Sequence, residues 1–456
     1  MNIHVPVPGN FSGIPWVRKK NQIHVRKYET RGDACWWIVV LISLVIITTL
    51  FPAVVTADSS MPRVEGVNPG DDAIVWGPYL TDTTHNSTVI HWKTSGPSVG
   101  RIGFSLNGID PPGISSRSVP EENPSILHQV QLDNLEPGQR YSYWIGNNSQ
   151  NYSFSTFPTD GSFTFVVYGD TREQLPLWNQ SDLHARVAER IAMEQDCLFV
   201  VHTGDLVNDP DDEGEWGRFF EAAGAMLAST TFFAVPGNHE GDLLKYQEYF
   251  GVPPWYNFTV SGFEFIIIDS NTLKPDREEQ QNRWINQTLA GPSNGRFVFL
   301  HHPMYTSEPN HWGGFLDIRG KWEQPFIEHN VIVVFSAHVH AYEHFYENGI
   351  DYLTMGTGGA PFYPLAEQKP AGYRNSTENT LAYARVTVSA KPDPTLVEVI
   401  KVAEIRDGRI IMSPPGTIIE RVLIPQPIGK PVDMWVNLFS SFHPLFKSKI
   451  LLFPYN

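Results

Sequence analysis

Cysteine is nearly absent from this sequence, which has only Cys35 and Cys197 among 456 residues. Two thiols cannot form a disulfide framework, so packing alone must hold the domains together. Positive charge is also scarce, because 33 Lys and Arg residues stand against 49 Asp and Glu residues and the formal net charge is -16. We expect no nucleic-acid partner, since the phosphate backbone attracts basic surfaces. The hydrophobic content of 41% fits a globular protein with real cores.

Long hydrophobic runs are absent except near the N-terminus. Residues 36–56 are mostly apolar and follow a basic head, residues 1–35, which holds six Lys and Arg residues but only two acidic ones. About 20 apolar residues can span a bilayer, and positive charge before a span places the N-terminus in the cytoplasm. We expect a single-pass anchor in the cell membrane with the rest of the chain outside. A cleaved signal peptide, which would leave a secreted protein, is the alternative.

Glycosylation signals agree with export. Seven N-x-Ser/Thr triplets lie beyond the apolar segment, which is compatible with an extracellular glycoprotein; they begin at Asn86, Asn147, Asn151, Asn179, Asn257, Asn286 and Asn375.

The rest of the chain divides by its patterns. A Ser/Pro/Gly/Asp-rich linker, residues 57–73, precedes short alternating strands over 74–158 that predict a β-sandwich. Tyr141 fits a tyrosine corner, in which the hydroxyl bonds back to the backbone. This segment resembles a fibronectin type III domain. Residues 426–456 form an apolar tail that either packs on the protein or lies on a membrane surface.

Strands alternate with helices over residues 160–425. Buried strands are predicted near 163–168, 198–201, 232–235, 263–268, 297–300 and 331–335. We expect helices from a cap at Ser181 and over 215–228. Such alternation indicates an α/β fold with partly parallel sheets, in which functional groups gather beyond the carboxyl ends of the strands.

Five polar motifs follow these strands. They are Gly169-Asp170, Gly204-Asp205, Gly237-Asn238-His239-Glu240, His301-His302-Pro303 and His338-Val339-His340. Oxygen and imidazole donors of this kind suit two neighbouring cations, which can generate hydroxide and neutralise the charge of a phosphate ester under attack. Ligand type does not choose among Mn, Fe and Zn.

The motifs and their order resemble calcineurin-like metallophosphoesterases, and the layout is similar to purple acid phosphatases with an N-terminal fibronectin type III-like domain. The resemblance implies a four-layer α/β (α+β) sandwich flanked by helices. It also implies that Asp170 and His340 bind a first metal, that Asp205 bridges both, and that Asn238, His301 and His338 bind the second. His239 would face the substrate as an acid or donor, and His302 would line the pocket or support a ligand.

The chain departs from the family pattern at two positions that matter. Arg172 stands where the family often has a metal-binding His, and Arg cannot ligate a metal because it has no free lone pair. It could instead bind phosphate through paired hydrogen bonds. Asn208 stands where purple enzymes have a metal-binding Tyr, so no iron–phenolate colour is expected. Tyr342 and His344 follow the last motif and are expected to border the pocket.

The resulting prediction is a metal-dependent phosphohydrolase that uses two divalent metal ions, Mn, Fe or Zn, most simply a phosphomonoesterase. A phosphodiesterase acting on nucleotides or lipid head groups is the first alternative, because both activities share these motifs. A catalytically inert surface scaffold is the second, because the first motif lacks its usual His.

Overall fold

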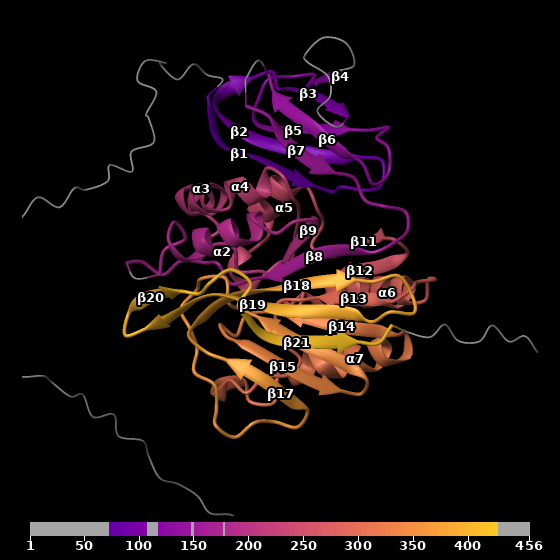
Figure 1. Ribbon diagram of the computed structural model, residues 1–456, viewed down its shortest axis with the longest axis vertical. Coiled ribbons are helices and arrows are strands. Elements are labelled where there is room, and N and C mark those ends of the chain that lie inside the picture. The colour runs from indigo at the N-terminus through magenta and orange to yellow at the C-terminus, as the bar shows by residue number, and fades with distance from the viewer. Residues whose placement is uncertain (1–72, 107–116, 147–149, 177, 427–456) are drawn as a thin grey trace, which may run out of the picture. The chain divides into compact units, whose positions relative to one another are not determined.

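The computed structural model describes residues 73–106, 117–146, 150–176 and 178–426 (Figure 1). These ranges fall within one compact unit, Val67–Asn456. The expected anchor at 36–56 lies outside the described residues, as do the linker except Ala73 and the C-terminal tail except Gln426. Within the described ranges, we find no helix long and apolar enough to cross a membrane.

The first part of the described chain is an antiparallel β-sandwich. One sheet has the order β1-β2-β5 and the other the order β4-β3-β6-β7. The strands are β1 (Ile74–Thr81), β2 (Thr88–Ser98), β3 (Arg101–Leu106), β4 (Arg117–Pro120), β5 (Ser125–Leu132), β6 (Arg140–Ile145) and β7 (Tyr152–Ser155). The backbone N–H of Glu136 donates to the hydroxyl of Tyr141 at 2.8 Å, which confirms the tyrosine corner. The likeness to fibronectin type III stays a prediction.

The second part contains two mixed sheets of seven strands each. The first has the order β10-β9-β8-β18-β19-β20, with β21 also paired to β19. Its strands are β8 (Phe163–Tyr168), β9 (Cys197–His202), β10 (Thr231–Ala234), β18 (Thr380–Val388), β19 (Thr395–Arg406), β20 (Arg409–Met412) and β21 (Ile418–Ile424). Strands β8, β9 and β10 are parallel, as the alternation of strands and helices predicts.

The second sheet has the order β11-β12-β13-β14-β16-β15-β17, and β12, β13, β14 and β16 run parallel. Its strands are β11 (Tyr256–Val260), β12 (Phe263–Ile267), β13 (Arg296–Phe299), β14 (Val331–Ser336), β15 (Tyr342–Glu347), β16 (Ile350–Met355) and β17 (Tyr373–Thr377).

Helices cover the outer face of each sheet. The α-helices are α2 (Leu183–Ala192), α3 (Glu213–Ala222), α4 (Gly224–Leu227), α5 (Leu244–Phe250), α6 (Pro275–Leu289) and α7 (Leu316–Glu328), and the short 3-10 helices are η2 (Asn238–Glu240) and η3 (Pro309–His311). The predicted cap at Ser181 is wrong, because α2 begins after Asp182. The predicted helix over 215–228 is divided at Ala223 into α3 and α4.

The side-chain alternation of the strands explains the layers. Phe165 and Val167 of β8 point into the core between the two sheets, whereas Val166 and Tyr168 point toward helices α2, α3 and α4. In the second sheet Val298 of β13 packs toward α6 and α7. Successive side chains of a strand lie on opposite faces, so each buried strand supplies two cores. The result is the four-layer arrangement of helices, two sheets and helices.

The β-sandwich is joined to the helical layer by aromatic packing. The ring of Trp76, from β1, stacks on Phe220 of α3 with centroids 4.1 Å apart and lies edge-on to Tyr249 at 5.3 Å. Trp76 is 6% exposed.

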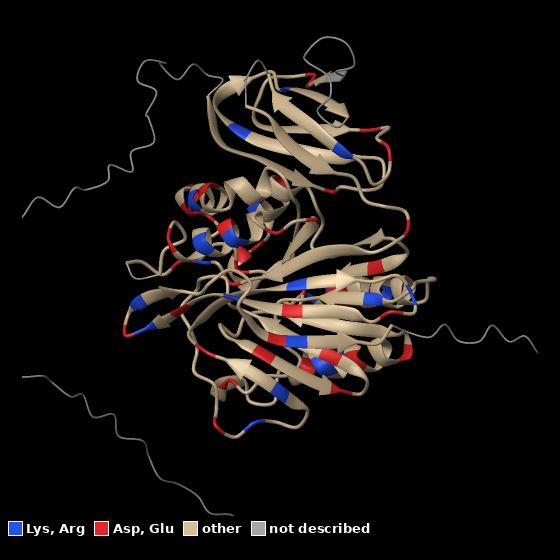
Figure 2. Cartoon of the chain, viewed as in Figure 1, with Lys and Arg blue, Asp and Glu red and all other residues tan. Residues whose placement is uncertain are grey.

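Figure 2 shows acidic and basic residues interspersed over the described elements.

Candidate metal centre

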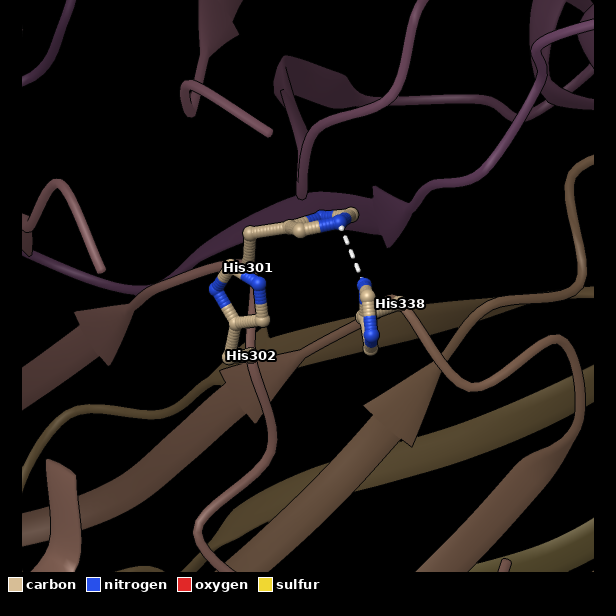
Figure 3. A group of neighbouring side chains, drawn as sticks. All are labelled: His301, His302 and His338. Carbon is tan, nitrogen blue, oxygen red and sulfur yellow. Dashed lines mark hydrogen bonds between the residues drawn. The ribbon is translucent and has the colours of Figure 1, made fainter. Parts of the chain in front are cut away.

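The five motifs converge at the carboxyl ends of β8, β9, β10, β13 and β14, as predicted. Each strand ends just before its motif, so the polar side chains emerge where the backbone leaves the sheet. Figure 3 shows three of them, His301 and His302 after β13 and His338 after β14, with the rings of His301 and His338 joined by a 3.2 Å contact.

Three ligand atoms form a tight triangle at the predicted second metal position. Asn238 Oδ1 lies 3.0 Å from His301 Nε2 and 2.8 Å from His338 Nδ1, and the two histidine nitrogens are 3.2 Å apart. Oδ1 of Asp205 is 3.3 Å from His301 Nε2. Metal–ligand bonds of about 2.0–2.2 Å place neighbouring ligand atoms roughly 3 Å apart, so this spacing matches a shared cation.

The predicted first metal position is built differently. Asp170 is wholly buried, yet neither of its carboxylate oxygens has a hydrogen-bond partner among the described residues. His340 Nε2 lies 3.6 Å from Asp170 Oδ1. A buried carboxylate without a partner is costly unless a cation satisfies it. Burial also raises the pKa of Asp170 well above its usual value.

Asp205 lies between the two groups. Its carboxylate belongs with Asp170 and His301 to one set of ligand atoms within 4.8 Å of each other. Burial opposes ionisation of Asp205, but the neighbouring His301 outweighs it and holds the pKa of the carboxyl below its usual value. In turn, burial would lower the pKa of His301, but Asp205 raises it to about 9. The carboxylates therefore favour a positive charge next to Asp205. The donor set fits two divalent metal ions.

Backbone hydrogen bonds fix which imidazole nitrogen faces the site. His301 Nδ1 contacts the carbonyl of Thr203 at 2.9 Å, and His340 Nδ1 contacts the carbonyl of Pro361. A carbonyl can only accept, so Nδ1 carries a proton, and Nε2 is the nitrogen that can bind a metal once it is deprotonated.

His302 has the opposite arrangement. Ser270 Oγ accepts from the backbone N–H groups of His301 and His302 at 3.2 and 3.0 Å and lies 2.9 Å from His302 Nδ1. The serine proton then points to Nδ1, which leaves Nε2–H as a donor. Burial lowers the pKa of His302 to about 3, so the ring is neutral. His302 is suited to donate to a substrate oxygen, as its predicted pocket role requires.

His239 and Arg172 border the same carboxylate. His239 Nδ1 contacts the carbonyl of Asn208 at 2.8 Å, and its Nε2 lies 3.9 Å from Asp205 Oδ2. Arg172 Nε lies 3.6 Å from the same oxygen, and its Nη1 donates to Asn208 Oδ1 at 3.2 Å. Both side chains therefore lie where a substrate bound at the metals would meet them.

Three of the predicted ligands have left-handed backbone. Asp170, Asp205 and His338 have φ values of 57°, 56° and 65°. Such conformations cost roughly 1–3 kcal/mol each in residues other than glycine. Hydrogen bonds offset part of this cost, because Asp170 N donates to Gly204 O and Thr171 N to Asp205 O, both at 3.0 Å. The strained backbone conformations therefore occur at residues whose side chains are predicted to bind the metals.

Two supporting residues were not predicted. Glu240 is 1% exposed and accepts the backbone N–H groups of Gly237, Asp205 and Leu206 at 2.6, 3.0 and 2.8 Å. It thereby ties the second motif to the third. Ser270 is the other. Only their positions in the sequence could have indicated these roles, because Glu240 is the last residue of the third motif and Ser270 follows strand β12.

Tyr342 and His344 do not serve the site as expected. Tyr342 donates to Glu420 at 2.7 Å, and His344 lies 2.9 Å from both Glu420 and Asp351. These two residues belong to a buried ionic network of β15, β16 and β21 that the sequence did not indicate.

Comparison with known families agrees with this geometry. Residues 163–342 match the family described as calcineurin-like phosphoesterase. The chain contains a calcineurin-like phosphoesterase domain. Purple acid phosphatase 21 of Arabidopsis thaliana is 25% identical over 267 residues, which is 52% of this chain and 59% of that protein. The Fe(3+)-Zn(2+) purple acid phosphatase 12 of the same plant is 26% identical over 252 residues, covering 48% and 52% of the two chains.

Solved structures show the same fold. The purple acid phosphatase PPD1 from yellow lupin (Lupinus luteus) superposes with a TM-score of 0.64 at 17% identity and covers 75% of this chain and 74% of its own. PhoD gives a TM-score of 0.57 at 13% identity, covering 76% and 90%. The match to purple acid phosphatase 21 spans only 59% of that protein's length.

Proposed function

We propose that this protein is a phosphohydrolase that cleaves phosphate monoesters and that Asp170, Asp205, Asn238, His301, His338 and His340 hold its two metal ions. The observation that carries the proposal is the triangle of ligand atoms from Asn238, His301 and His338, which lie 2.8–3.2 Å apart. The Asp205 carboxylate lies close to both His301 and the unpartnered carboxylate of Asp170. The sequence relatives named above are phosphatases, which supports hydrolysis of monoesters.

The chain's own residues then have separate tasks. When bound, the two cations supply a hydroxide nucleophile and neutralise charge on the phosphoryl oxygens. Asp205 fixes their spacing. His239, whose Nδ1 contacts the Asn208 carbonyl, presents Nε2 as a donor to the phosphoryl group or to the leaving oxygen. Arg172 and the Nε2–H of His302 supply further hydrogen bonds to phosphate oxygens.

A substrate panel tests this proposal. We expect the full-length chain, reconstituted with Mn or Zn, to hydrolyse nitrophenyl phosphate faster than bis-nitrophenyl phosphate. Asp205→Asn should lose nearly all activity. Preference for the diester would instead support the phosphodiesterase alternative, and full activity in Asp205→Asn would refute the shared-carboxylate role. Metal well below two ions per chain together with no hydrolysis would favour the inert scaffold.

We further propose that the protein is exported and anchored through residues 36–56. The basic head before the apolar run supports this proposal, as do the exposed sequon asparagines Asn86, Asn151, Asn257 and Asn286. In a glycosylating host, peptide N-glycosidase should lower the apparent mass of the protein. Protease added to intact cells should digest the catalytic part and spare a short N-terminal fragment. An unglycosylated, fully protected protein would contradict the proposal.

A further inference from the structure

Tyr363 is an aromatic residue of the site that neither the motifs nor the family pattern identified. It lies in the irregular segment between β16 and β17, well downstream of the last metal-binding motif. Its ring stacks on the imidazole of His340, with centroids 4.1 Å apart and planes 20° from parallel. Its side chain is only partly buried. A tyrosine in this position needs an explanation beyond packing.

The segment that carries Tyr363 is fastened to the site. His340 Nδ1 donates to the carbonyl of Pro361, and the backbone N–H of Tyr363 donates to the carbonyl of His340 at 3.4 Å. Phe362, between them, packs edge-on against Trp178 at 5.3 Å. These contacts fix the phenol ring relative to His340, so its orientation is built into the fold.

Among the described residues, the hydroxyl of Tyr363 has a donor beside it but no acceptor for its proton. Arg172 Nη2 donates to this oxygen at 3.4 Å. A phenol that accepts one hydrogen bond still has its own proton to donate. Arg172 Nε is likewise buried and has no hydrogen-bond partner within the described part of the chain. Arg172 Nε lies 3.6 Å from Asp205 Oδ2, which is too long for a hydrogen bond, so the guanidinium and the neighbouring phenol each keep a proton to donate.

The stacking geometry decides what the hydroxyl can reach. A metal bound by an imidazole lies in the plane of that ring, about 2 Å from the nitrogen. A ring stacked 4.1 Å away at only 20° from parallel carries its hydroxyl well outside that plane. The phenol oxygen therefore lies out of the plane in which His340 would hold an ion, which favours a role in substrate binding over a role as a metal ligand.

We propose that Tyr363 is a substrate-binding residue that donates its hydroxyl proton to a phosphoryl oxygen held on the His340 side of the site, together with Arg172. This assignment rests on the proposed phosphohydrolase function and deepens it. The Tyr363–Arg172 pair supplies hydrogen bonds to phosphate at the position where Arg172 and Asn208 replace the metal-binding side chains of the family.

Replacement of the hydroxyl alone tests the assignment. Tyr363→Phe keeps the stacked ring, and Tyr346→Phe, which alters a 42% exposed tyrosine, is the matched control. The readouts on the metal-loaded full-length chain are metal content, calorimetric affinity for inorganic phosphate, and kcat and KM on nitrophenyl phosphate. We expect unchanged metal content in Tyr363→Phe, with phosphate affinity and kcat/KM about tenfold lower, the loss of one hydrogen bond to a charged oxygen.

Several results would overturn the assignment. Unchanged phosphate affinity and kcat/KM in Tyr363→Phe, with normal wild-type activity, would refute it and leave the proposed function intact. Metal loss in this variant, or a visible phenolate band of the Fe(III)-loaded wild type that Tyr363→Phe abolishes, would make Tyr363 a ligand instead. A wild-type protein that binds metal but neither phosphate nor ester would refute the proposed function and this assignment together.

Discussion

The carboxylate of Glu240 gives the sharpest test of how the site is supported. Its Oε2 accepts from the backbone N–H groups of Gly237 and Asp205, and its Oε1 accepts from Leu206. Glu240→Ala leaves three buried donors unsatisfied at roughly 1–3 kcal/mol each. We therefore expect the free energy of unfolding to fall by at least about 3 kcal/mol.

Glu240→Gln should cost less. The amide oxygen can take the Oε2 position and keep two bonds, but the amide nitrogen then faces the N–H of Leu206, and one charge-assisted bond of about 1.5–3 kcal/mol is lost. Part of this loss is offset, because burial, aided by the charge of Asp205, raises the pKa of Glu240 to about 7, so the anion is itself costly. The net expectation is about 2 kcal/mol.

Urea unfolding of the metal-free full-length chain measures both values, and metal titration measures the consequence for the site. Because Glu240 holds the backbone of Asp205, Glu240→Ala should also weaken metal binding by at least about tenfold, as for other residues that orient ligands. Glu221→Ala, an exposed position on α3, is the control and should change stability by under about 0.5 kcal/mol. Equal stability and metal affinity in Glu240→Ala and wild type would refute the supporting role.

Three further predictions follow from the packing and the charges. Trp76→Ala should lower stability by about 3–5 kcal/mol in urea unfolding, because it removes a buried aromatic ring from the junction with α3; a loss under about 1 kcal/mol would show that the junction is dispensable. Gly356→Ala should weaken metal binding about tenfold or more, because its Cβ would lie 2.1 Å from a backbone carbonyl of the last motif and 2.5 Å from Asp170. Gly217→Ala, which has open space around it, is the control and should bind metal as the wild type does. Equal metal affinities of the two variants would contradict this reasoning. Burial would lower the pKa of His344, but its two carboxylate partners raise the pKa to about 9. The protonated ring therefore contributes its full stability below about pH 6.5, and this contribution is lost as the pH rises to about 9. Over that range the urea midpoint of the wild type should fall relative to that of His344→Gln, and a constant difference between the two midpoints would exclude the effect.

The sequence predicts the catalytic framework well because each motif directly follows a buried strand. Apolar runs such as 163–168 and 331–335 identify strands β8 and β14, and parallel strands must bring their carboxyl ends to one edge. Asp170 and His338 could therefore be placed together although they are far apart in the chain. The left-handed backbone at both residues, by contrast, depends on tertiary hydrogen bonds and has no local signal.

The residues that support and complete the site are harder to predict. Glu240 acts through backbone N–H groups of another loop, and Ser270 acts through the backbone of the histidine motif, so neither role leaves a pattern of side chains. Tyr363 reaches His340 through an irregular segment whose path no periodicity encodes. The start of α2 after Asp182 rather than Ser181 is also hard to predict, because Ser and Asp are both favoured at N-caps and local preference does not choose between them.

Anomalous diffraction from crystals of the Mn-loaded protein tests the central claim most directly. The claim predicts two peaks, one among Asn238, His301 and His338 and one beside Asp170 and His340, with the Asp205 carboxylate contacting both. A single peak, or peaks remote from these side chains, would contradict it.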